Sequence, residues 1–185
     1  MAFLDTNPVA ARTDDQFATS ADFRKLFTEH TRSLYLLSFL LTADHQKAKR
    51  CFVRGLDDCL EERSVFQEWV ESWTRRIIVH NAIRMMAPHL VPAKWAQGTI
   101  NSARKGNRST IRPQDTQFAG VLALGDFERF VYVLSVLERY TDQNCAVLLG
   151  VSQQEIRETR RRALQHAASF DKRNAVPTDS HSDMK

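Results

Sequence analysis

The chain has 185 residues, of which 43% are hydrophobic and 26% charged, and it carries a formal net charge of +4. This size suits one medium domain or two small ones, and the basic balance permits a nucleic-acid partner without requiring one. No apolar run reaches the roughly 20 residues of a membrane span and the N-terminal residues lack the apolar core of a signal peptide, so we expect a cytoplasmic protein with no membrane partner.

Helical periodicity begins after an aperiodic segment at residues 1–19, which is predicted to be a disordered tail. From Ser20, a predicted N-cap, apolar residues keep helical spacing to Thr42. A second helix is predicted from about Asp44. Its apolar or small residues are Ala48, Cys51, Phe52, Leu56, Cys59 and Leu60.

A third helix is predicted to open with a capping box formed by Ser64 and Gln67 and to end before Pro88. Its predicted apolar face consists of Phe66, Trp69, Val70, Trp73 and Ile77. Because both tryptophans fall on that face, we expect them in the core rather than at a binding site.

The helical pattern stops at residues 88–125, which contain three prolines and four glycines. Between Pro92 and Pro113 the stretch has five basic residues and no acidic one. A structureless connection of this length is improbable inside a compact domain, so it is predicted to be a flexible basic linker between two helical domains at residues 20–87 and 126–170. Residues 171–185 are predicted to be a second disordered tail.

The second domain is predicted to contain three helices, of which the last two form a helix-turn-helix. Gly150 suits the positive φ of a helix end, and Ser152 with Glu155 forms a capping box. In the last helix one face carries Ile156, Thr159, Ala163, Ala167 and Phe170, and the opposite face carries Gln153, Gln154, Arg157, Glu158, Arg161 and Gln165. An exposed Arg/Gln face suits the base edges of a DNA major groove, although a charged face is more often only solvated.

The sequence offers little for catalysis or metal binding. Cys51, Cys59 and Cys145 are odd in number and lack C-x-x-C spacing, which favours buried free thiols over disulfides or a zinc site. It also lacks an H-E-x-x-H motif, a glycine-rich phosphate loop and a nucleophile elbow. We therefore expect no enzyme, no catalytic residue, no metal or cofactor, and no small-molecule substrate.

Two helical domains, the second with a helix-turn-helix, resemble the extracytoplasmic-function group of bacterial sigma factors. The resemblance covers about residues 20–87 and 122–168, and the order and spacing of its motifs carry more weight than any single one. In the second domain the motifs are F-E-R-F-V-Y-V-L at 127–134, A-V-L-L-G-V-S at 146–152 and R-R-A at 161–163. In the first they are F-R-K-L-F-T-E-H at 23–30, L-Y-L-L-S-F-L-L-T-A-D at 34–44 and W-T-R-R-I-I-V-H-N at 73–81.

This resemblance implies an all-α protein that binds core RNA polymerase and promoter DNA during transcription initiation, and it allows an anti-sigma factor as a further partner. At the −35 element it places Gln153, Gln154, Arg157, Glu158 and Arg161. At the −10 element it places Arg75, Arg76, His80, Asn81 and Arg84. At the polymerase contact it places Lys49 and Arg50, and Asp57, Asp58 and Glu61, further along the same helix, are the residues to which that contact is predicted to shift.

The charge of the expected polymerase contact departs from the family. Members commonly carry an acidic run after the T-G-D turn, whereas residues 47–53 here read K-A-K-R-C-F-V. Basic residues would then face the basic polymerase clamp, which disfavours docking unless Asp57, Asp58 and Glu61 supply the contact. The alternative therefore stays open that the chain is a degenerate relative, a stand-alone DNA-binding regulator or interaction module without polymerase binding. A second departure is Arg160, which replaces a usual leucine and is expected to extend to solvent.

Overall fold

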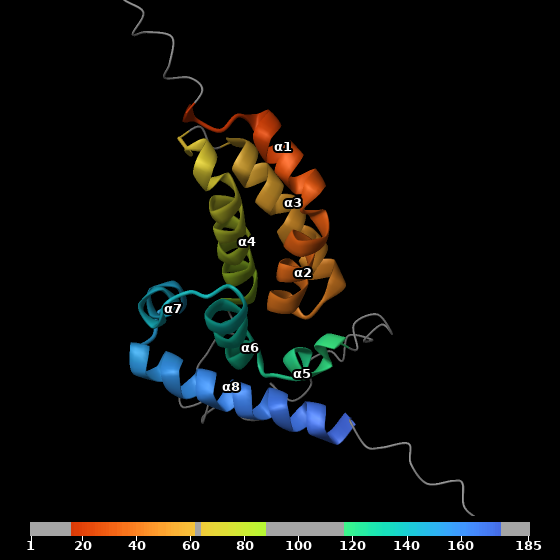
Figure 1. Cartoon of the computed structure of the whole chain (residues 1–185), viewed down its shortest axis with the longest axis vertical. Helices are drawn as coiled ribbons and strands as arrows, with labels where there is room; N and C mark the ends of the chain where they lie inside the picture. Colours follow the sequence, from red (N-terminus) through yellow and green to blue (C-terminus); the bar gives the residue numbers. More distant parts are fainter. Residues whose placement is uncertain (1–15, 62–63, 88–116, 175–185) are drawn as a thin grey trace, which may run out of the picture. The chain divides into compact units, whose positions relative to one another are not determined.

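The computed structural model describes residues 16–61, 64–87 and 117–174, and these residues are almost entirely helical (Figure 1). Within them the only β-type pairing is an isolated bridge, so the predicted all-α fold class is confirmed. None of the described helices is both long enough and apolar enough to cross a membrane. The chain divides into two compact units, Met1–Met86 and Ala87–Lys185. That each unit folds independently stays a prediction.

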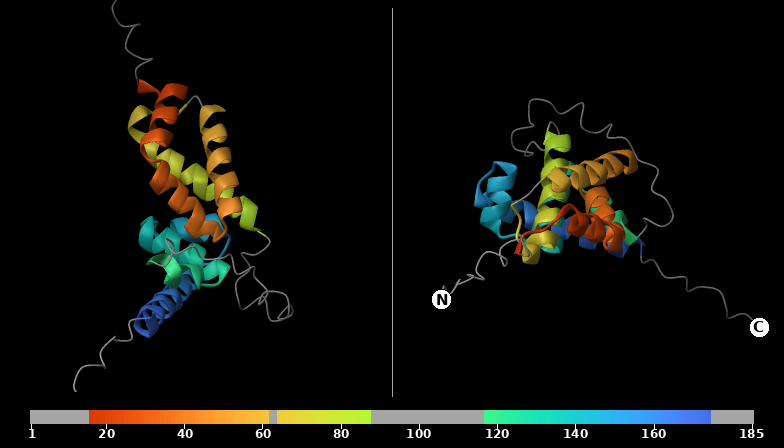
Figure 2. Two further views of the ribbon diagram at one scale, coloured as in Figure 1. Left: turned by 90° about the vertical axis from the view of Figure 1, so that its right-hand side faces the viewer. Right: turned by 90° about the horizontal axis from the view of Figure 1, so that it is seen from above.

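The first unit contains α1 (Ser20–Glu29), α2 (Thr31–Thr42), α3 (His45–Glu61) and α4 (Val70–Met86), which Figure 2 shows from two further sides. Helices α2, α3 and α4 pack against one another, and α1 lies mainly against α3. Gly55 allows the close approach of α3 to α4, because a Cβ atom there would lie 3.0 Å from Cγ1 of Ile78. The fully buried side chains at the centre include Phe23, Leu34, Leu41, Ile78 and Val79.

The predicted helix from residue 20 to residue 42 is two helices. His30 separates α1 from α2 with a φ of −106° and a ψ of 18°. The N-cap is Thr19 rather than Ser20: the Thr19 hydroxyl accepts from the backbone N–H of Asp22, and the Asp22 carboxylate accepts from the Thr19 N–H at 2.8 Å. Apolar spacing could not reveal the break, because both helices bury residues on a continuous helical register.

The start of the third predicted helix also differs. A 3-10 turn, η3 (Gln67–Trp69), follows Phe66 at the N-cap without a side-chain cap, so the predicted capping box at Ser64 does not open the helix. The buried face of α4 runs through Val70, Thr74, Ile78 and Ala82. This face is rotated away from the predicted one, and the expectation of a core position is wrong for Trp69, which is 54% exposed. Trp73 is half-buried.

An exposed aromatic group explains the position of Trp69. The rings of Phe17 and Phe66 stack with centroids 4.9 Å apart, and Trp69 meets Phe66 edge-on at 5.1 Å. The backbone N–H of Ala18 donates to the carbonyl of Val65 at 2.7 Å. Residues 16–19 are therefore attached to the first unit and are not part of a tail, while the rest of the predicted tail, residues 1–15, lies outside the described residues.

The second unit contains α5 (Ala119–Leu122), α6 (Asp126–Tyr132), a π-helical turn η8 (Val133–Leu137), α7 (Asp142–Leu149) and α8 (Gln153–Asn174). Helix α8 packs against α5, α6 and α7. The core of the second unit includes the fully buried Phe130, Leu134, Ile156 and Ala163. The three helices predicted for residues 126–170 correspond to α6 with η8, α7 and α8.

The C-terminal boundary predicted for the linker, residue 125, is wrong. Residues 117–125 include helix α5, which contacts α8, and Leu124 is only 5% exposed. The apolar run of Val121, Leu122 and Leu124 favours packing of this segment over an unstructured linker, because the burial of apolar side chains is favourable. Residues 88–116 lie outside the described residues. At the other end α8 reaches Asn174, so residues 171–174 are helical rather than part of the predicted tail.

Candidate nucleic-acid interface

The connection between α7 and α8 is fixed by hydrogen bonds at both helix ends. Thr141 caps α7 by accepting from the Asn144 N–H at 3.1 Å. At the other end Gly150 has a φ of 67°, and its N–H donates to the Ala146 carbonyl. The Ser152 hydroxyl then accepts from the Glu155 N–H at 3.2 Å and caps α8. The predicted roles of Gly150 and Ser152 are confirmed.

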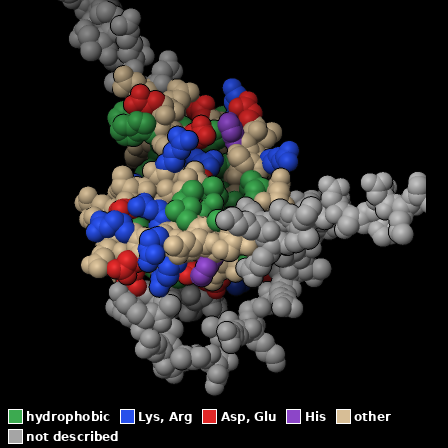
Figure 3. Space-filling model, turned by 60° about the horizontal axis from the view of Figure 1, so that its bottom comes forward, with side chains coloured by type: hydrophobic (Ala, Val, Ile, Leu, Met, Phe, Trp, Pro, Cys, Tyr) green, Lys and Arg blue, Asp and Glu red, His purple; other side chains and the backbone are tan. Residues whose placement is uncertain are grey.

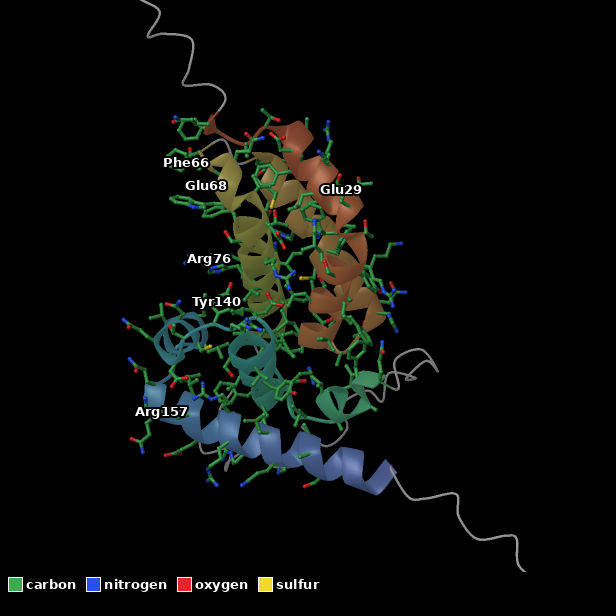
Figure 4. All side chains as sticks on the ribbon, in the orientation of Figure 1. Glu29, Phe66, Glu68, Arg76, Tyr140 and Arg157 are labelled. Carbon is green, nitrogen blue, oxygen red and sulfur yellow. The ribbon has the colours of Figure 1, made fainter. Side chains whose placement is uncertain are left out.

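Helix α8 has one buried and one exposed face, as the sequence predicts. Ile156, Thr159 and Ala163 are fully buried, and Glu155 at the cap is 7% exposed. The opposite face is exposed at Gln153, Gln154, Arg157, Glu158, Arg161 and Gln165. Arg157 projects from the first turns of α8 in Figure 4, and Figure 3 shows Lys and Arg side chains beside acidic ones on the surface. The side chain of Phe170 lies outside the description.

An acidic residue of α7 holds two arginines of α8. The guanidinium of Arg160 donates to the Asp142 carboxylate at 2.6 and 3.5 Å, and the side chain of Arg160 is 33% exposed. The expectation that Arg160 extends to solvent is therefore wrong, because a carboxylate within reach offers a charge-assisted hydrogen bond. Arg157 lies further away, with a guanidinium nitrogen 3.9 Å from the same carboxylate. Arg161 forms no ion pair with another described residue.

A second set of polar contacts joins α8 and the start of α6. Glu128 lies 3.2 Å from Nδ1 of His166 and 3.8 Å from Nε of Arg162. Arg129 is only 3% exposed, and it donates to the Leu124 carbonyl at 3.1 Å and to Asp126 at 2.5 Å. Sequence reasoning missed Arg129, and its one signal was the i, i+3 spacing from Asp126.

The residues expected at the −10 element lie on α4 but do not form one exposed surface. Arg76 and Arg84 are exposed, Arg75 and His80 are half-buried, and Asn81 is 3% exposed. Arg76 projects outward from α4 in Figure 4. Burial is the main cause that lowers the pKa of His80 from its ordinary 6.5, and the positive charges of Arg76 and Arg84 lower it further.

Asn81, Arg84 and Asp58 form one network, although the sequence assigned them to two different sites. The Asn81 amide donates to the Asp58 carboxylate at 2.8 Å, and Arg84 donates to Asp58 at 3.2 Å and to the Asn81 carbonyl oxygen at 3.1 Å. Because Asn81 is buried and its amide is engaged, it stabilises the contact between α3 and α4 and is not available to a nucleotide in this structure.

The other residues expected at the polymerase contact lie along the outer side of α3. Lys49, Arg50, Asp57 and Glu61 are exposed, whereas Asp58 is turned towards α4. The basic pair precedes the acidic pair by about two helical turns. The outer side of α3 is therefore basic at one end and acidic at the other.

The described residues contain no group of three or more His, Cys, Asp or Glu side chains that could hold a metal ion. The three cysteines are buried free thiols, as predicted. Burial raises the pKa of Cys51 and of Cys145 to about 11, which makes both thiols unreactive at neutral pH.

Comparison with known proteins adds no further constraint, because no protein-family model matches the sequence and no curated protein matches it either.

Proposed function

We propose that this chain is a sigma factor similar to the extracytoplasmic-function group, which brings core RNA polymerase to promoters and places the exposed face of α8 in the major groove of the −35 element. The observation that carries the proposal is the exposed row of Gln153, Gln154, Arg157 and Arg161 on a helix whose other face is occupied by the core of its own unit. Of these two faces of α8, only the exposed one is left for a partner. Arginine can pair with guanine and glutamine with adenine.

The capped turn supports this role of α8. Recognition helices read bases mainly with their N-terminal residues, and Gln153, Gln154 and Arg157 occupy the first two turns. Gly150, at the end of α7, and Ser152, at the start of α8, fix the direction of α8 relative to α7. A guanine-reading arginine contributes about 1–3 kcal/mol of discrimination against other bases.

In the first unit we assign the −10 role to the exposed side of α4. Arg76 and Arg84 are exposed cations suited to phosphates, and Trp69 with Phe66 offers aromatic faces on which unpaired bases can stack. Asn81 is left out of this assignment because it is buried and bonded to Asp58. Polymerase docking is assigned to Asp57 and Glu61, the exposed acidic residues of α3.

A second candidate function is a stand-alone DNA-binding regulator. Lys49 and Arg50 are exposed on α3 where sigma factors of this group commonly carry acidic residues, and no ion pair joins either of them to another described residue. Like charges facing each other across an interface cost several kcal/mol, which favours DNA binding without polymerase.

The DNA-binding part of the proposal is tested by selecting duplexes from a random pool with the full chain and then measuring affinities of variants at one stated salt concentration. Arg157→Gln and Arg161→Gln should each weaken binding about 5- to 150-fold, equivalent to roughly 1–3 kcal/mol, without lowering the melting temperature. Arg139→Asn is the matched control: it removes one positive charge from the same unit, and asparagine tolerates the φ of 58° found there. Equal affinities for all four proteins would remove the face of α8 from the site.

A further inference from the structure

Asp142 is the first residue of α7, beside the proposed DNA-binding face, and its carboxylate faces two arginines of α8. Arg160 donates to Oδ1 at 2.6 Å and to Oδ2 at 3.5 Å, and Oδ2 also lies 3.9 Å from the guanidinium of Arg157. The Asp142 side chain is 22% exposed, so bound DNA would not be fully screened from its charge by solvent.

The two arginines differ in how closely they contact Asp142. Arg160 makes two donor contacts and is 33% exposed, so it is held between α7 and α8. Arg157 makes only the longer contact and is 55% exposed, so its guanidinium can leave for a ligand. Arg160 acts as a positioning residue: its two donor contacts hold the Asp142 carboxylate beside Arg157.

We propose that Asp142 is a specificity-determining residue that makes Arg157 read bases rather than bind phosphates. The inference rests on the proposed DNA binding by α8. A phosphate on the Arg157 guanidinium would bring a full negative charge close to the Asp142 carboxylate. The O6 and N7 acceptors of guanine carry no net charge and meet a smaller penalty.

The size of this effect follows from the charge separation. A phosphate bound to the Arg157 guanidinium would lie about 4.5–6 Å from the Asp142 carboxylate, and like charges at that separation in a water-like environment reduce affinity about three- to fivefold. Because phosphates are present in every sequence, the repulsion lowers non-specific binding more than binding to the selected site. Asp142 therefore raises the ratio of specific to non-specific affinity without contacting DNA.

The test is Asp142→Asn in the full chain, with dissociation constants measured over a salt series for the selected duplex and for a scrambled duplex of equal length. Affinity for the scrambled duplex should rise about three- to fivefold and affinity for the selected duplex should rise less. The slope of log affinity against log salt should steepen by about 0.9 for the scrambled duplex, as expected when one more phosphate is neutralised. A purely structural role for Asp142 would instead lower both affinities.

Glu128→Gln is the matched control, because Glu128 is also 22% exposed and also faces α8, through Arg162 and His166, but lies away from Arg157. It should leave the affinity ratio and the salt slope at the wild-type values. Adding Arg157→Ala to Asp142→Asn should return the slope to the wild-type value, because the extra phosphate contact is lost.

An unchanged affinity ratio and slope in Asp142→Asn, or an equal change in Glu128→Gln, would overturn the inference and leave the proposed function standing. Wild-type protein that selects no duplex would instead refute DNA binding by α8, and this inference with it.

Discussion

Asp58→Ala should destabilise the first unit much more than Arg84→Ala, although both variants remove the same ion pair. Asp58 accepts hydrogen bonds from Asn81 at 2.8 Å and from Arg84 at 3.2 Å. Asn81 is 3% exposed, so removing its acceptor leaves a buried amide unsatisfied and costs about 1–3 kcal/mol. The Arg84 side chain is 61% exposed, so its ion pair contributes roughly 0–1 kcal/mol because water and salt screen it, and water can replace its hydrogen bond to the Asn81 oxygen.

The assay is urea denaturation of the full chain followed by tryptophan fluorescence, since Trp69 ends the η3 turn just before α4 and Trp73 lies in the first turn of α4. Asp58→Asn is an informative third variant, because its side-chain oxygen can still accept from Asn81 and should retain most of the stability. An Arg84→Ala variant as unstable as Asp58→Ala would contradict this prediction, because it would show that the exposed contacts of Arg84 and not the hydrogen bond from the buried amide dominate.

Three further predictions concern local conformation and protonation. Gly150→Ala should destabilise the second unit by about 1–2 kcal/mol in urea denaturation: its φ is 67°, and the open space around an added Cβ leaves backbone conformation as the sole cost. Cys51 and Cys145, whose folded pKa of about 11 exceeds the ordinary 9.0, should contribute stability that is complete below pH 9 and is lost between pH 9 and about 11, and a thiol reagent should label them at pH 8 only on unfolding. His80, whose folded pKa is lowered from 6.5, should contribute stability that is present above pH 6.5 and lost in acid, and His80→Gln should reduce that loss; an unchanged acid unfolding profile would contradict it.

The sequence predicts the second unit better than the first, because its helix ends carry side-chain and backbone signals. Gly150 and Ser152 mark the turn before α8: Gly150 has the positive φ that glycine favours, and the Ser152 hydroxyl caps α8. The faces of α8 follow from spacing alone, since its buried positions are small or apolar. Local chemistry and tertiary packing agree there, and such agreement makes a sequence predictive.

In the first unit, tertiary packing overrides the apolar pattern. Trp69 has the spacing of a core residue, but it packs against Phe66 at the surface, and no periodicity distinguishes the two environments. Asp58 and Asn81 are 23 residues apart, so their hydrogen bond depends on how α3 crosses α4. The hydrogen bond between Arg160 and Asp142 likewise depends on how α8 packs against α7 across the turn between them.

The most direct test of the proposed function is transcription in vitro with core RNA polymerase from the organism that encodes this chain. Templates carry a duplex selected by the protein, placed upstream of a start site, and polymerase association is measured in parallel by co-sedimentation. A sigma factor of this kind should give a defined transcript that requires the chain and is lost with Arg157→Gln. Asp57→Asn combined with Glu61→Gln should reduce both the transcript and polymerase association. A wild-type chain that binds the selected duplex but neither associates with core polymerase at micromolar concentration nor supports a transcript would contradict the sigma-factor proposal and favour the stand-alone regulator.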